Sequence, residues 1–197
     1  MSEKPLFWNK DTIGVSVESE ELRAPLMAAI ADWNAVPCGQ IRLVLDPHNN
    51  SSNKVVLRQK HEWSFEPNVL AMTILSHCGN PAILSKVQIQ VNQGNRPWTY
   101  LDYKNILLHE LGHFLGLGHS DKLDAVMHPM GQLGDSEREL THDDITKFCA
   151  LSPTQPEIKT GCSQAGFSTD AGLFGVLLVG LFIFCTARKH SSIWRWT

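Results

Sequence analysis

The chain has 197 residues, of which 43% are hydrophobic and 19% are charged, and its formal net charge is −3. This length and composition predict one compact domain with an appendage, and they exclude a collagen, a repeat solenoid and a wholly disordered chain. The mildly acidic balance offers no electrostatic footprint for nucleic acid, so no nucleic-acid partner is expected.

The pattern of the first hundred residues predicts five strands and one helix. Strands are expected at residues 12–19, 41–46, 54–59, 69–76 and 86–92. After the first strand, an Ala-rich segment with helical spacing predicts a helix over residues 22–36. Pro25 should lie near the first turn of this helix, because a proline in a helix interior costs about 3 kcal/mol.

Two further helices complete the predicted domain. Residues 103–115 are expected to form a helix that ends at Gly116, and residues 141–152 a last short one. Thr141 is a candidate cap for the last helix, because its side chain can accept a hydrogen bond from an N–H of the first turn. Together the elements predict an α+β domain over residues 1–152.

Three histidines, His109, His113 and His119, occur in the stretch HELGHFLGLGH. His109 and His113 are four residues apart on the predicted helix, so both project from one face and can reach one ion. Gly116 can adopt a backbone conformation that residues with a Cβ avoid, which allows His119 to return as a third ligand. Three neutral imidazoles with one position open to water are the ligand set of a catalytic zinc ion. We therefore expect one bound Zn²⁺.

Glu110 follows the first histidine and flanks the expected ion, about 100° around the helix from His109. A zinc ion lowers the pKa of its bound water and polarises a substrate carbonyl. Glu110 is then placed to take a proton from the water and to deliver it to a leaving amine. The pattern indicates metal-assisted hydrolysis of amides.

The stretches HELGHFLGLGH and AVMHP resemble the zinc motif and the methionine turn of the metzincin metalloproteases. The GHS and Met-x-Pro residues are most similar to the matrixin branch of that family. This resemblance covers most of residues 6–152 and implies a five-stranded mixed sheet, three helices and a zinc-dependent endopeptidase that acts on extended peptide or protein substrates. It also implies that Met127 supports the metal site from beneath.

The same resemblance assigns roles to residues around the cleft. The segment VLAMTILS is similar to the strand at the edge of the matrixin cleft, where backbone groups pair with an extended peptide. The residues so assigned are Leu70, Ala71, Met72, Thr73 and Ile74. The wall of the side-chain pocket is expected from residues 128–140, and His128 is a candidate for lining the cleft. Small bacterial matrixins are the most similar type, because SHCGNPAILSKVQIQVN lacks the ligands for a second, structural zinc.

The five cysteines are Cys38, Cys78, Cys149, Cys162 and Cys185. They include no Cys-x-x-Cys pair, which disfavours a zinc site made of cysteines. The similar bacterial proteins often carry cysteines at the places of Cys38 and Cys149, so the resemblance implies a disulfide between these two. Cys78 is the competing partner.

The C-terminal segment differs from the domain. Residues 153–170 form a polar linker, and residues 171–187 carry no charge. At 1.5 Å per residue this run is about 25 Å long, which favours a transmembrane helix over a buried helix of the domain. The basic residues 188–197 should stay in the cytoplasm, with the protease domain outside it. A Gly-Cys-Ser triplet at Cys162, the apolar helix and the basic end resemble the sorting tails of myxobacterial surface proteins, which implies a sorting protease that acts near Cys162.

The first residues show no signal-peptide pattern, whereas the expected orientation requires export. A true start upstream of Met1 is one explanation and mature numbering is another, and both fit the expected orientation better than a cytosolic protein does. Two other functions stay open: a zinc-dependent endoribonuclease with three histidine ligands, and a surface-binding module that keeps the fold without useful turnover. Glu110, Met127 and the acidic charge of the domain disfavour the endoribonuclease.

Overall fold

The computed structural model describes residues 6–78, 83–94, 97–129 and 136–151. The strands are β1 (Thr12–Val17), β2 (Arg42–Leu45), β3 (Lys54–Arg58), β4 (Ala71–Cys78) and β5 (Ile83–Asn92), and the helices are α1 (Glu20–Asn34), α2 (Tyr100–Leu115) and α3 (His142–Ala150). The strands form one sheet in the order β2-β1-β3-β5-β4. All neighbours are parallel except β4, which runs antiparallel to β5 at one edge. The predicted α+β domain with a five-stranded mixed sheet and three helices is confirmed.

Both long helices begin earlier than the sequence predicts. α1 begins at Glu20, so Pro25 lies in its second turn, on the buried face of the helix. Packing of that face offsets the free-energy cost of the helical hydrogen bond that is lost because proline has no backbone N–H. α2 begins at Tyr100 because Thr99 and Asp102 form a capping box: the Thr99 hydroxyl accepts the Asp102 N–H at 3.1 Å, and the Asp102 carboxylate accepts the Thr99 N–H at 2.9 Å.

The last two strands also differ from their predicted bounds. β4 is shifted two residues toward the C-terminus relative to the expected 69–76, and β5 begins three residues before the expected position 86. The two strands pair along their length, with one irregularity between Ser76 and His77. Pairing across this hairpin extends β5 beyond the run that its alternating pattern predicts.

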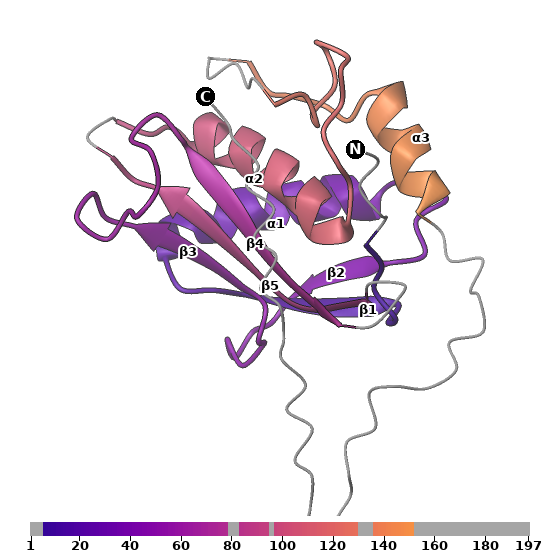
Figure 1. Ribbon diagram of the computed structural model, residues 1–197, viewed down its shortest axis with the longest axis horizontal. Coiled ribbons are helices and arrows are strands. Elements are labelled where there is room, and N and C mark those ends of the chain that lie inside the picture. Colours follow the sequence, from indigo (N-terminus) through magenta and orange to yellow (C-terminus); the bar gives the residue numbers. More distant parts are fainter. Residues whose placement is uncertain (1–5, 79–82, 95–96, 130–135, 152–197) are drawn as a thin grey trace, which may run out of the picture.

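α1 and α2 lie side by side over the sheet (Figure 1). Two buried tryptophans tie neighbouring segments to α2: Trp33 of α1 donates its indole N–H to the Leu108 carbonyl at 2.9 Å, and Trp8 donates to the Phe114 carbonyl at 2.8 Å. A buried indole usually finds such a partner because its unpaired N–H would cost free energy. The result is a central helix held by both the N-terminal segment and α1.

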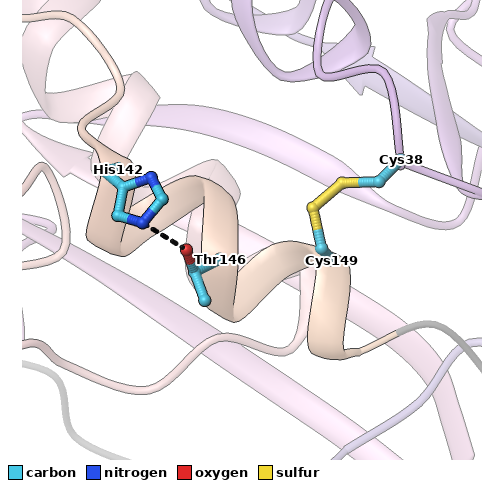
Figure 2. The surroundings of a disulfide bond; sticks show 4 residues. All are labelled: Cys38, His142, Thr146 and Cys149. Carbon is cyan, nitrogen blue, oxygen red and sulfur yellow. Dashed lines mark hydrogen bonds between the residues drawn. A yellow bond between two sulfur atoms is a disulfide. The ribbon is translucent and has the colours of Figure 1, made fainter.

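α3 is joined to the segment after α1 by a disulfide between Cys38 and Cys149 (Figure 2). The two Cα atoms are 5.4 Å apart, and the bond joins positions 111 residues apart in the chain. The disulfide that the resemblance implied is confirmed, and the competing pairing with Cys78 is wrong. The bond closes a long loop, which is the case in which a disulfide restricts the unfolded chain most.

The linker 153–170, the apolar run 171–187 with its basic end 188–197, and Cys162 lie outside the described residues. Among the helices that are described, none has the length and apolar character needed to cross a membrane. Part of the expected pocket wall, residues 130–135, also lies outside the described ranges.

Candidate metal centre

α2 is buried at every position from Asp102 to Leu115. A helix buried on all sides is expected to be apolar all round. Six of its buried residues are instead polar or charged: Asp102, Lys104, Asn105, His109, Glu110 and His113. Because an unpaired buried polar group costs free energy, the partners of these side chains show what each one does.

Lys104 and Asn105 fasten residues 136–138, which belong to the expected pocket wall. The Lys104 ammonium forms ion pairs with Asp32 of α1, at 2.9 Å, and with Glu137. Burial by itself would lower the pKa of Lys104, but hydrogen bonds to the two carboxylates raise it above its ordinary value. The Asn105 amide donates to the carbonyl of residue 136 at 3.0 Å and accepts the N–H of residue 138 at 2.9 Å. These two side chains have structural partners and are not available to a ligand.

His109 and His113 use one ring nitrogen each to hold their orientation. His109 Nδ1 lies 2.6 Å from the Val126 carbonyl, and His113 Nδ1 lies 2.8 Å from the Leu117 carbonyl. A carbonyl only accepts, so each Nδ1 carries the hydrogen and each Nε2 carries a lone pair. Burial and the neighbouring histidines lower both pKa values, that of His113 to about 3, so both rings are neutral.

The Nε2 atoms of His109 and His113 are 3.0 Å apart. Since both Nδ1 hydrogens are committed to carbonyls, two lone pairs face each other at this distance, and a cation between them relieves the repulsion. Two Zn–N bonds of 2.0–2.1 Å at the tetrahedral angle would separate the nitrogens by about 3.3 Å. The pair therefore fits a zinc ion with only a small adjustment.

The chain turns back toward this pair at Gly116. Its φ of 107° lies in the left-handed region, and a Cβ at this position would be 2.5 Å from the Leu6 carbonyl oxygen. The return places the His119 ring 5.3 Å from the His109 ring and 4.8 Å from the His113 ring, between centroids. The ligand atoms of all three histidines lie within 4.8 Å of one another. The structure thus brings the three predicted ligands together.

His128 lies close to the third ligand. Burial, followed by the charge of His128, lowers the pKa of His119 to about 4. His119 is therefore neutral near physiological pH like the other two ligands, which is the form that binds a metal. His128 itself is half-buried, and its predicted place in the cleft lining stays a prediction. Three neutral imidazoles are the donor set of an open, catalytic zinc site.

Met127 is fully buried and packs against α2 at Gly112, between the two helical histidines. A Cβ on Gly112 would lie 2.2 Å from the Met127 sulfur, so no larger residue fits there without a shift. Our sequence prediction did not include Gly112. Its signal was a glycine in a helix interior, which costs about 1 kcal/mol relative to alanine and so implies a packing reason.

Asp144, in the first turn of α3, holds the methionine turn. It is fully buried, and its two oxygens accept the backbone N–H groups of Val126 at 2.9 Å and Met127 at 3.0 Å. The carboxylate also completes a capping box with Thr141, the residue predicted to cap this helix. The spacing of Thr141 and Asp144 in the sequence predicts the capping role, whereas it does not predict the contact of Asp144 with the methionine turn.

Glu110 is fully buried beside the histidines. Burial raises its pKa to about 8, although a hydrogen bond from Thr73 acts in the opposite direction. The Thr73 hydroxyl donates to Glu110 Oε2, while Glu110 Oε1 is buried and has no hydrogen-bond partner among the described residues. One oxygen of the predicted general base is thus held, and the other is available.

β4 supplies the predicted substrate-edge residues. Ala71, Met72 and Thr73 are buried in it, Ile74 is half-buried, and Leu70 lies just before its first residue. Among the described strands β4 pairs only with β5, so its other edge is open. Figure 1 shows this strand beside α2, the helix of the metal site. The pairing of these residues with a substrate stays a prediction.

The matrixin family model matches residues 12–151 of the chain. Metalloendoproteinase 5-MMP of Arabidopsis thaliana is 49% identical over 66 residues, which are 34% of this chain and 18% of that protein. Metalloendoproteinase 1-MMP of the same plant is 32% identical over 97 residues, covering 43% of this chain and 27% of the relative. The chain therefore matches only about a quarter or less of the length of these relatives. The family match spans the sheet, the three helices and the histidine site, and the chain belongs to the matrixin family of zinc metalloendopeptidases.

Proposed function

We propose that this chain is a zinc-dependent endopeptidase in which Glu110 is the general base. The observation that carries the proposal is the pair of buried, neutral histidines whose Nε2 lone pairs converge, next to a carboxyl group with one available oxygen. Membership of the matrixin family supports the same activity. The acidic residue after the first histidine and the methionine turn favour peptide hydrolysis over the alternative of RNA cleavage.

His109, His113 and His119 would hold the zinc ion through ring nitrogens. When bound, the ion would lower the pKa of the attacking water and polarise the carbonyl of the scissile bond. Glu110 accepts the proton of the water at Oε1 and passes it to the nitrogen of the leaving amine. Hydrogen bonds to the Val126 and Leu117 carbonyls keep two of the rings in the orientation that this arrangement requires.

The substrate in this proposal is an extended peptide or protein segment. Its backbone adds to the open edge of β4, where the backbone of Leu70 to Ile74 supplies hydrogen-bonding groups. Residues 128–140, of which 130–135 lie outside the described ranges, are proposed as the wall of the side-chain pocket. The chain is of the bacterial matrixin type, with a single zinc ion.

We also propose that residues 171–187 anchor the protein in a membrane with the protease domain outside the cytoplasm. The support is the uncharged apolar run and the basic residues after it. Matrixins are generally extracellular or secreted, and the Cys38–Cys149 disulfide suits an oxidising compartment. A sorting protease would act near Cys162. Fractionation of the full chain and of a chain ending at residue 170 tests the anchor: the full chain should resist carbonate extraction, and equal extraction of both would contradict it.

Glu110→Gln tests the catalytic proposal on a library of peptides. The variant should bind one zinc ion per chain like the parent, while kcat/KM falls about a hundredfold to ten-thousandfold. Glu20→Gln is the matched control, because Glu20 is exposed in the first turn of α1, outside the proposed metal site and substrate cleft, and its replacement should leave cleavage unchanged. Equal cleavage by the Glu110 variant and the parent would overturn the base assignment. A parent that binds zinc and cleaves no peptide would favour the surface-binding module, and cleavage of RNA alone would favour the endoribonuclease.

A further inference from the structure

Thr73 of β4 makes a side-chain contact with the proposed general base. It is fully buried, and its hydroxyl donates to Glu110 Oε2. The main-chain oxygen of Glu110 is also within reach of this hydroxyl, at 3.4 Å. A threonine hydroxyl has one hydrogen to give, and the side-chain oxygen of Glu110 is the nearer of the two acceptors. The hydrogen therefore goes to the carboxylate.

The position of the Thr73 hydroxyl is well defined. The backbone of Thr73 is paired with Ile89 in the antiparallel ladder between β4 and β5. Threonine is branched at Cβ, which restricts rotation about its first side-chain bond. A donor held by both the sheet and its own rotamer can orient a mobile carboxylate, which otherwise rotates freely about its last bond.

The contact with Thr73 makes the two carboxyl oxygens of Glu110 different from each other. Oε2 accepts the Thr73 hydrogen bond, and Oε1 is buried with no hydrogen-bond partner in the described part of the chain. We propose that Thr73 is a positioning residue, whose hydroxyl holds Oε2 of Glu110 so that Oε1 receives and returns the proton during peptide hydrolysis. This inference rests on the proposed function of Glu110 as general base.

The same strand then serves two purposes. The backbone of β4 at its open edge is proposed to pair with the substrate, and a side chain of β4 orients the group that transfers the proton. One rigid strand thus positions both the substrate backbone and the Glu110 carboxyl group. A merely structural role for the Thr73 hydroxyl, as a buried donor that needs an acceptor, would affect stability without a specific effect on the chemical step.

Thr73→Val and Thr73→Ser, made in the full chain and loaded with zinc, separate the two roles. Valine keeps the shape of threonine without the donor, whereas serine keeps the donor. The valine variant should bind one zinc ion per chain and show a kcat lowered about tenfold to a hundredfold, with KM within about twofold of the parent value. The serine variant should recover kcat to within about threefold. Ser16→Ala, which removes a buried hydroxyl on β1, is the control and should leave kcat unchanged.

Crystal structures of the zinc-free parent and variants give a readout that does not depend on activity. The Glu110 carboxylate should keep one orientation in the parent and the serine variant and turn away from it in the valine variant. Should the valine variant fail to fold, Thr73→Ala replaces it under the same criteria.

A donor-free variant with parental kcat, or a serine variant no better than it, would overturn the inference. If Glu110→Gln is inactive while the valine variant is fully active, only the role of Thr73 fails. If Glu110→Gln cleaves like the parent, the proposed function itself fails.

Discussion

Replacing Asp144 by asparagine should destabilise the domain by about 2–5 kcal/mol. The Asp144 carboxylate accepts the N–H groups of Val126 and Met127, both buried, and the N–H and hydroxyl of Thr141, which are part-buried. An asparagine oxygen placed at Oδ2 keeps three of these bonds, but its NH₂ group then faces the Met127 N–H. Two buried donors are left unpaired, at about 1–3 kcal/mol each, and the remaining bonds lose the negative charge.

Urea unfolding of the zinc-free chain, followed by tryptophan fluorescence, measures this loss. Asp143→Asn is the matched control, because Asp143 is more exposed and bonds only to Ser120 and Lys147 among the described residues. The control should cost about 1 kcal/mol or less, as expected for a surface ion pair. If the two variants lowered the free energy of unfolding equally, the methionine turn would not depend on α3 as described.

Gly116→Ala should lower the melting temperature and weaken zinc binding, because alanine would have to adopt a φ of 107° and place its Cβ 2.5 Å from the Leu6 carbonyl oxygen. Gly94→Ala is its control in calorimetry: the φ of Gly94 is also positive, at 55°, but the nearest atom would be 3.8 Å away, so an equal loss would contradict the close contact at Gly116. Reduction of the Cys38–Cys149 disulfide should cost about 2–5 kcal/mol in urea unfolding, and a reductant should have no such effect on a chain with serine at both positions. Unchanged stability of the reduced parent would show that the disulfide does not restrain α3.

Much of the metal site could be predicted from the sequence because its information is local. Helical spacing alone puts His109 and His113 on one face, and a glycine three residues later permits the turn that brings His119 back. The confirmed disulfide had a different origin, since it followed from the resemblance and not from the spacing of the cysteines. The capping residue Thr141 was likewise readable from its own neighbourhood.

The contacts that join distant segments could not be predicted in this way. Thr73 and Glu110 are 37 positions apart, and Asp144 reaches Met127 across 17 positions. Each partner looks ordinary in its own element: a threonine in a strand and an aspartate in a helical first turn. Only the packing of β4 against α2, and of α3 against the methionine turn, gives them a second role. The early start of α1 has a similar origin, since tertiary packing accommodates a proline that local cost would place in the first turn.

The most direct test of the metal centre is anomalous diffraction at the zinc edge from crystals of the zinc-loaded chain. We expect one peak within the domain, about 2.0–2.1 Å from ring nitrogens of His109, His113 and His119, with the remaining position open to water. A zinc ion bound elsewhere, or held by His109 and His113 without His119, would contradict the three-histidine site.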